Sequence, residues 1–457
     1  MKRKVAIIIF GGLMATSAAA SPALSEDPGA AGGAVSENSI GTLKTRRVNI
    51  PADATQVRGR ISGFDATENG RLVAFSSSAT NLVAGDGNKS FDVFVKDTET
   101  GGIEIVSVGS DGALGNGYSI SPSISSDGRY VAFASSSDNL VPGDTNGWED
   151  IFVHDRATAT TERISLSTEG EEANVESFSP VISDDGRFVV FGSNADNLTS
   201  QDDNPYLDLF LRDRELGTTE MVNVSSDEVQ AEAFSLSLHP QISADGRYVA
   251  FHSDAKNLVP NDNNGDDRHW VDDVFLRDRV EGTTTLVSVS TSGKQGNSAS
   301  SAPAMTPDGR FIAFESLATN FARRDRNRAY DVFVRDLVEG TTRRASLSSK
   351  GRRANGVSLA PSISPDGRFV AFASLASNLV GDDTNGEFDI FRRDLERRRT
   401  VRISVNSRGK QARGNRDWLH SHIAAGGHWV IFESSATNLV RGDTNRAADI
   451  FMRGPYN

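Results

Sequence analysis

The residues best suited to chemistry belong to an acidic motif, Asp-x-Asn-x-x-x-Asp, that returns in most copies of a long internal repeat. Its oxygen-bearing members are Asp86, Asn88 and Asp92; Asp144, Asn146 and Asp150; Asp202, Asn204 and Asp208; Asp383, Asn385 and Asp389; and Asp443, Asn445 and Asp449. Calcium loops place carboxylate and amide oxygens at the first, third and seventh positions in the same way. The motif therefore predicts calcium sites in several repeats.

A second interpretation of the motif is structural. Asp and Asn side chains in loops accept hydrogen bonds from nearby backbone amides, and a last Asp can fix the start of the following strand. The twelfth position, where an EF-hand has a bidentate Glu, holds none here, and arginines 323, 324, 326 and 328 crowd the loop of the fifth repeat. Calcium binding and capping both remain open from the sequence.

Three of the seven histidines form a second candidate site. His239 and His420 occupy the same position in two copies of the repeat, and His422 follows two residues later. Imidazoles bind metal ions and exchange protons near neutral pH. These side chains are candidates for a metal or proton-exchange site at the mouth of a central channel, and the alternative is a solvated pair without a bound ion.

The repeat itself is anchored by seven phenylalanines, spaced 58 to 63 residues apart: Phe75, Phe133, Phe191, Phe251, Phe314, Phe372 and Phe432. Each repeat holds four short apolar runs, which in the second repeat are 122–125, 129–135, 150–154 and 161–167. Asp-Gly between the first two runs favours a tight hairpin turn. The second run is apolar without alternation, as in a strand covered on both faces.

Four-stranded sheets packed between similar sheets are the blades of a β-propeller. The sequence thus predicts an all-β, seven-bladed propeller of four-stranded antiparallel blades. The last repeat stops after its third run, and Val48 precedes Phe75 by 27 residues, the spacing that separates Val106 from Phe133. The N-terminal strand is therefore expected to complete the last blade and close the ring, which leaves no open sheet edge.

The core Ser-x-Asp-Gly-Arg-x-Val-Ala-Phe, followed by Asp-Ile-Phe-Val-x-Asp, resembles the TolB-type, WD-like propeller repeat of bacterial envelope proteins. The resemblance covers residues 43–457. It implies the fold more strongly than a function, because similar repeats occur in Tol-Pal periplasmic subunits, in peptidase accessory domains and in some carbohydrate-active enzymes.

The rest of the chain predicts export. Residues 1–20 have the charged, apolar and small-residue order of a signal peptide, residues 21–42 read as a flexible linker, and the propeller occupies 43–457. A secreted or periplasmic monomer without a membrane span is expected. The formal charge of −13 is the wrong sign for a nucleic-acid partner.

Two functions compete. The first is a non-enzymatic binding or scaffolding propeller that presents its loops on one face to a protein, peptide or glycan of the cell envelope. The alternative is a metal-dependent polysaccharide lyase or hydrolase that works at the channel mouth through the three histidines. The chain has no Gly-x-Ser-x-Gly and no His-Glu-x-x-His, so no catalytic residue is assigned and the non-enzymatic function is predicted.

Overall fold

The computed structural model describes residues 43–51, 56–57, 59–232, 239–262, 271–322, 327–415, 420–445 and 447–456. The predicted signal peptide and linker lie outside these residues. The described residues form 28 strands and one short 3-10 helix, η1 (Ala425–Gly427). Within that part of the chain, no helix has the length and hydropathy needed to cross a membrane.

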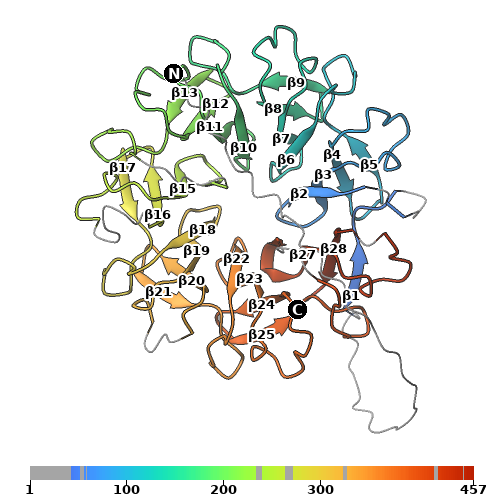
Figure 1. Ribbon diagram of the computed structural model, residues 1–457, viewed down its shortest axis with the longest axis vertical. Helices are drawn as coiled ribbons and strands as arrows, with labels where there is room; N and C mark the ends of the chain where they lie inside the picture. Colours follow the sequence, from blue (N-terminus) through green and yellow to red (C-terminus); the bar gives the residue numbers. More distant parts are fainter. Residues whose placement is uncertain are drawn as a thin grey trace, which may run out of the picture. The chain divides into compact units, whose positions relative to one another are not determined.

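The strands form seven four-stranded antiparallel sheets, arranged as blades around a central axis (Figure 1). Blade 1 contains β2 (Ile61–Ala66), β3 (Leu72–Ser77), β4 (Asp92–Asp97) and β5 (Ile103–Ile105). Blade 2 contains β6 (Ser119–Ile124), β7 (Tyr130–Ser135), β8 (Asp150–Asp155) and β9 (Thr160–Arg163). Blade 3 contains β10 (Ser177–Ile182), β11 (Phe188–Ser193), β12 (Asp208–Asp213) and β13 (Thr218–Met221).

The next three blades repeat this order. Blade 4 contains β14 (Gln241–Ile242), β15 (Tyr248–Ser253), β16 (Asp273–Asp278) and β17 (Thr283–Leu286). Blade 5 contains β18 (Ser300–Met305), β19 (Phe311–Ser316), β20 (Asp331–Asp336) and β21 (Thr341–Arg344). Blade 6 contains β22 (Ser358–Ile363), β23 (Phe369–Ser374), β24 (Asp389–Asp394) and β25 (Arg399–Arg402).

Blade 7 joins the two ends of the propeller. It contains β26 (Ser421–Ile423), β27 (Val430–Ser434), β28 (Asp449–Gly454) and, as its outer strand, β1 (Lys44–Arg47). β1 pairs antiparallel with β28, and the Val48 amide extends the pairing to the Ile450 carbonyl at 2.7 Å. The predicted seven blades and the predicted closure by the N-terminal strand are both confirmed.

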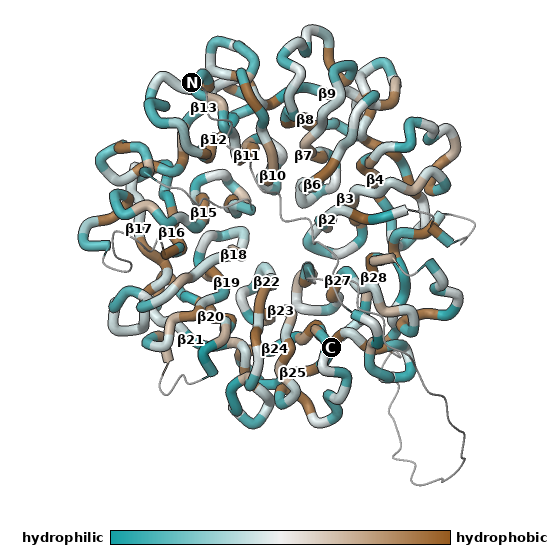
Figure 2. The backbone as a smooth tube through the Cα atoms, viewed as in Figure 1, coloured by the Kyte–Doolittle hydropathy of each residue, from teal (hydrophilic) through white to brown (hydrophobic). Residues whose placement is uncertain are grey.

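The apolar second strand of each blade is buried on both faces, as its lack of alternation predicts. In β7, Val131 and Phe133 pack in one cluster with Ala74 of blade 1, while Ala132 and Ala134 pack with blade 3. All of them are fully buried. Because successive side chains of a strand point to opposite faces, one short run holds three neighbouring blades together, and hydrophobic stretches accordingly follow the strands (Figure 2).

Each anchor phenylalanine meets a second phenylalanine on the third strand. In blade 2, Phe133 and Phe152 are register partners, and their ring centroids are 6.0 Å apart in a stacked arrangement. Aromatic pairs at this separation stabilise a core beyond the area that they bury. The same pair recurs in all seven blades.

The Asp-Gly turns act as the hairpin chemistry predicts. Gly128 has φ 74°, and a Cβ at this position would lie 2.1 Å from a methyl group of Leu72 in blade 1. Asp127 accepts hydrogen bonds from the Arg129 amide at 2.8 Å and the Ser125 hydroxyl at 2.7 Å. Turn conformation and close blade packing therefore both require the glycine.

Two predicted strand limits in the second repeat are wrong. The first strand begins at Ser119, ahead of the predicted residue 122, and contains an irregularity where Ser121 adopts φ 52°. The fourth strand ends at Arg163, short of the predicted residue 167. Beyond it, the Ile164 amide still donates to the Ile151 carbonyl at 2.7 Å, and the Ser165 side chain turns back to donate to Asp150.

Candidate functional site

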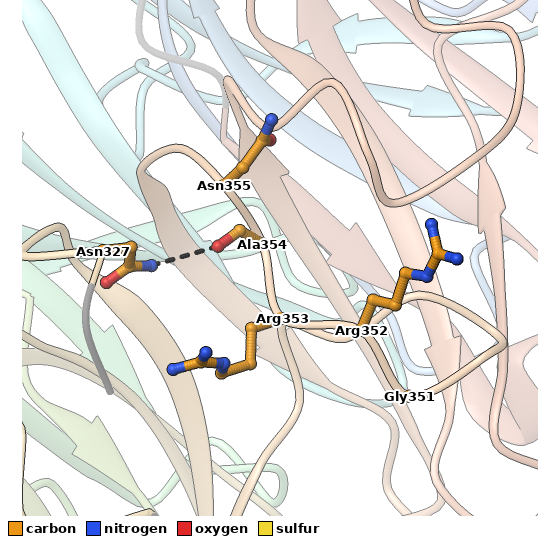
Figure 3. Close-up of a pocket in the computed structure, with 6 residues that line it drawn as sticks. All are labelled: Asn327, Gly351, Arg352, Arg353, Ala354 and Asn355. Atoms are coloured by element: carbon orange, nitrogen blue, oxygen red, sulfur yellow. Dashed lines mark hydrogen bonds between the residues drawn. The ribbon is translucent and has the colours of Figure 1, made fainter. Parts of the chain in front are cut away.

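Two kinds of loop carry the candidate site. The long loops join the second and third strands of a blade, and the linking loops lead from one blade to the next. In blade 2, the Asn146 Nδ2 group donates to the Ala173 carbonyl of the following linking loop at 3.0 Å. Equivalent hydrogen bonds occur in four other blades, and Figure 3 shows the one between Asn327 and Ala354. Both kinds of loop therefore share one face.

The Asn of the acidic motif also forms an Asx turn. Asn146 Oδ1 accepts a hydrogen bond from the Trp148 amide at 2.9 Å, and the same contact recurs in five other blades. With its oxygen and its amide both bound to backbone, this side chain has the role that the capping interpretation predicts.

The last Asp of the motif opens the third strand and is fully buried in every blade. Asp150 accepts a hydrogen bond from the Ser165 hydroxyl, whose oxygen accepts in turn from the Ile151 amide at 3.1 Å. Each of the other blades has the same bridge, through Ser107, Asn223, Ser288, Ser346, Ser404 or Asn49. The carboxylate fixes the start of the strand, because its bridge satisfies the first backbone amide.

The first and last Asp of the motif, Asp144 and Asp150 in blade 2, form an acidic pair. Their remaining carboxylate oxygens need a hydrogen-bond donor or a positive charge, and most blades supply one. In blade 2 the Arg163 guanidinium lies 3.3 Å from Asp144 and 3.7 Å from Asp150. Arginines of the fourth strand take this place in three further blades: Arg344 in blade 5, Arg402 in blade 6 and Arg47 in blade 7. In blade 3 the Gln230 amide donates to Asp202 and Asp208 at 2.9 and 2.8 Å, and Gln295 does the same in blade 4.

Burial governs the protonation of these carboxylates. It raises the pKa of Asp144 to about 6, with the neighbouring Asp150 charge acting in the same direction and Arg163 opposing it. Burial also raises the pKa of Asp208 to about 7, against the hydrogen bond from Asn223. These are environments in which a buried carboxylate requires a counter-charge or a donor. The contacts favour capping in these blades, and calcium there stays a prediction.

The structure brings two of the predicted histidines together. The rings of His239 and His420 lie edge to face with centroids 6.3 Å apart. Solvent reaches both side chains, yet the surrounding protein lowers the pKa of each, and the charges of His420 and His252 add to this effect on His239. Both imidazoles are therefore neutral near pH 7, the form that binds metal ions.

His422 lies apart from this pair. Its Nδ1 atom is 3.6 Å from the Asp65 carboxylate of blade 1. In the described ranges, no group of three or more His, Asp or Glu side chains is placed to hold one metal ion. The three histidines are thus a neighbouring pair and a separate histidine–carboxylate contact.

Sequence reasoning missed two aromatic residues of blade 2. Trp148 of the long loop is 47% exposed and Tyr118 of the linking loop is 39% exposed. The Tyr118 hydroxyl donates to the Glu149 carboxylate at 2.6 Å, which holds the two loops together. The only signal in the sequence was that Trp148 occupies a position held by Ser90, Ala329, Glu387 and Ala447 in other repeats, with a second aromatic, Tyr206, at this position in the third repeat.

Comparison with known proteins identifies the fold. No family model matches the sequence, and no curated protein matches it. A solved oligogalacturonate lyase in complex with manganese is 12% identical, with 91% of this chain and 96% of that chain covered and a TM-score of 0.53. The propeller domain of the Trilobed protease from Pyrococcus furiosus is 14% identical, with coverages of 87% and 94% and a TM-score of 0.52.

TolB from Acinetobacter baumannii is also matched, at 15% identity and a TM-score of 0.41. The match covers 75% of this chain, which spans 63% of that TolB chain. The prediction of a TolB-type propeller is confirmed at the level of architecture by the seven four-stranded blades. The molecule belongs to the structural class of seven-bladed β-propellers.

Proposed function

We propose that this protein is an exported, non-enzymatic binding propeller that presents its loop face to a protein, peptide or glycan of the cell envelope. The observation that supports this function most directly is the aromatic surface of blade 2, formed by Tyr118 and Trp148. Of the other exposed apolar residues, Leu216, Val280 and Val338 follow the third strands of their blades and so lie on the opposite face, whereas Val229 lies in a linking loop and Leu375 begins the long loop of blade 6.

The aromatic surface has two properties of a binding anchor. Tyr and Trp offer large contact areas together with a polar group, and they dominate the energetics of many interfaces. The loops that carry them are already held in place by the hydrogen bond from Asn146 to the Ala173 carbonyl and by the hydrogen bond from Tyr118 to Glu149. A preordered surface loses little conformational entropy when a partner binds.

Fluorescence titration of the full chain with a panel of peptidoglycan fragments, oligogalacturonates and envelope peptides tests this function. We expect Trp148→Ala to weaken binding of the recognised probe by about tenfold or more, and Val338→Ala on the opposite face to leave it unchanged. Equal affinities for the two variants would contradict the proposal, as would the absence of binding to every probe.

The histidine pair favours a second candidate function, a metal-dependent polysaccharide lyase or hydrolase at the channel mouth. Its support is the proximity of two neutral imidazoles, His239 and His420. Incubation of the protein with oligogalacturonates and Mn²⁺, followed by ultraviolet absorbance and reducing-end assays, tests it. Product that appears with the unaltered protein and not with a His239→Ala, His420→Ala double variant would establish catalysis in place of simple binding.

A further inference from the structure

The acidic pair of blade 1 differs from the pairs in the other blades. The two positions that supply its counter-groups elsewhere are apolar here. Ile105 stands at the end of the fourth strand, where blades 2, 6 and 7 have Arg163, Arg402 and Arg47. Leu114 stands in the linking loop where later blades have Gln230 and Gln295. Asp86 and Asp92 therefore have neither the arginine nor the amide that their equivalents use.

Two oxygens of this pair are left without a partner. Asp92 is fully buried, and its Oδ1 atom accepts from Ser107 at 2.8 Å. Its Oδ2 atom and the Oδ1 atom of Asp86 are both buried and accept no hydrogen bond from the described residues. The Asn88 amide, which lies near Asp92 and favours its charged form, donates to the Gly115 carbonyl at 3.1 Å.

The two carboxylates also repel each other. Burial and the Asp92 charge together raise the pKa of Asp86 to about 6, and burial raises the pKa of Asp92. The nearest basic residue along the chain, Lys89, is exposed, and no ion pair joins it to either carboxylate within the described ranges. Buried carboxylate oxygens that have neither a counter-charge nor a donor, as Asp92 Oδ2 and Asp86 Oδ1 are within the described residues, are strongly disfavoured.

We infer that blade 1 binds one calcium ion between Asp86 and Asp92, in the place that an arginine or glutamine side chain fills in the other described blades. Carboxylate oxygens are the preferred ligands of Ca²⁺, and water completes its shell of six to eight oxygens. Water has access because Asp86 is partly exposed. A hard divalent cation suits this site better than a zinc-type ion, since neither histidine nor cysteine contributes to it. The site does not depend on the proposed partner-binding function.

The repeats supply the variants for a test. Ile105→Arg gives blade 1 the arginine of blades 2, 6 and 7, and Leu114→Gln gives it the amide of blades 3 and 4. Asp86→Asn removes one ligand charge. Asp144→Asn makes the same change in blade 2, where Arg163 already occupies the site, and is the matched control.

Calorimetric titration of the full, EDTA-treated chain with CaCl2 should show one Ca²⁺ per chain in the unaltered protein and in Asp144→Asn. Asp86→Asn, Ile105→Arg and Leu114→Gln should each weaken binding by about tenfold or more. The melting temperature should rise with Ca²⁺ only in the proteins that bind it.

Three results would overturn the inference: no heat of binding in the unaltered protein, unchanged affinity in the three blade 1 variants, or an equal loss in Asp144→Asn. Leu114 is partly exposed, so Leu114→Gln keeps the test decisive if Ile105→Arg does not fold. Melting in EDTA establishes which variants are folded.

Discussion

At the scale of single residues, some carboxylates lie where burial and neighbouring negative charges disfavour their charged form. Asp184, in the turn between the first two strands of blade 3, is one of them. Burial raises its pKa to about 6 from an ordinary value of 3.8, and the charges of Glu68, Asp65 and Asp185 act in the same direction. The proton is therefore held more tightly in the folded protein than in the unfolded chain.

This shift predicts how stability changes with pH. Because the folded state binds the Asp184 proton more tightly, the free energy of unfolding falls as pH rises from about 4 to about 6, and the loss persists above that range. Asp184→Asn should therefore raise the free energy of unfolding by about 1 kcal/mol at about pH 7.5, after allowance for partial exposure, and should give no gain at about pH 4. Urea denaturation at the two pH values measures the difference.

Asp382→Asn, in the exposed long loop of blade 6, is the control for this prediction. It should leave the pH dependence as it is in the unaltered protein. A gain from Asp184→Asn that is as large at the acidic pH as at the neutral pH would show that charge repulsion is not the cause.

At the scale of strands and loops, the bridge between the last Asp of the motif and its Ser or Asn determines where each third strand begins. Ser165→Ala removes one such bridge in blade 2. It leaves the Oδ1 atom of Asp150 without its donor and the Ile151 amide without its acceptor, both in the buried interior, while Asn146 still donates to the Oδ2 atom of Asp150 at 2.8 Å. We expect a loss of about 2–3 kcal/mol in the free energy of unfolding.

Chemical denaturation measures this loss. The matched control is Ser126→Ala, which makes the same substitution in a partly exposed turn of the same blade. Ser126→Ala should change stability by less than about 0.5 kcal/mol. If both variants lose the same amount, the bridge does not stabilise the strand.

The strands and blades could be predicted from the sequence because they depend on local, repeated features. The unbroken apolar run around Phe133 and the Asp-Gly turn at Gly128 act within a few residues, and seven copies reinforce each other. The sequence left the acidic motif open between capping and calcium binding, since the choice depends on side chains that strand register brings together. Arg163 lies 13 residues after Asp150, and only the pairing of β9 with β8 places its guanidinium beside the carboxylates.

The aromatic surface was beyond the sequence for a related reason, whereas the shared repeat position of His239 and His420 did predict that these two residues lie near the channel mouth. The exposure of Trp148 follows from how the loops around it pack, and the distance between His239 of blade 4 and His420 of blade 7 follows from the closure of the whole ring, which no single repeat encodes. By contrast, the substitutions at Ile105 and Leu114 were visible in the alignment of repeats, although their meaning required knowing what Arg163 and Gln230 contact.

At the scale of the whole molecule, blade 7 differs from the other six blades in how its outer strand is connected. Its outer strand, β1, comes from the other end of the chain, whereas in each other blade a short turn joins the outer strand to the third strand. The Thr45 hydroxyl donates to the Val405 carbonyl of the preceding blade at 2.6 Å, and its amide donates to Ser407 at 3.0 Å. In blade 2, Thr161 makes the same two kinds of contact, to Val108 and Ser110. Thr45 and Thr161 therefore make equivalent hydrogen bonds to the preceding blade, and they differ in that only Thr45 lies on a strand from the other end of the chain.

Proline substitution separates local damage from loss of closure. Thr45→Pro and Thr161→Pro each remove an equivalent backbone donor. Thr161→Pro should lower the free energy of unfolding by about 1–3 kcal/mol, and Thr45→Pro should lower it by more, because it also opens the ring. Calorimetry combined with limited proteolysis near Lys44 measures both effects.

Release of β1 should make that segment sensitive to protease in Thr45→Pro alone. Equal losses of stability and equal cleavage in the two variants would show that closure contributes no more than any other outer strand.

The pairing of β1 with β28 also dictates an order of events during synthesis. The hydrogen bond between Arg453 and Thr45 spans 408 residues, so the first strand to leave the ribosome has no partner until the last one has emerged. If the other blades fold as the chain emerges, this first strand is an unsatisfied edge of the kind that pairs with other chains until β28 is available. A protein shortened before residue 449 would keep that edge open and would therefore aggregate more readily than the full chain.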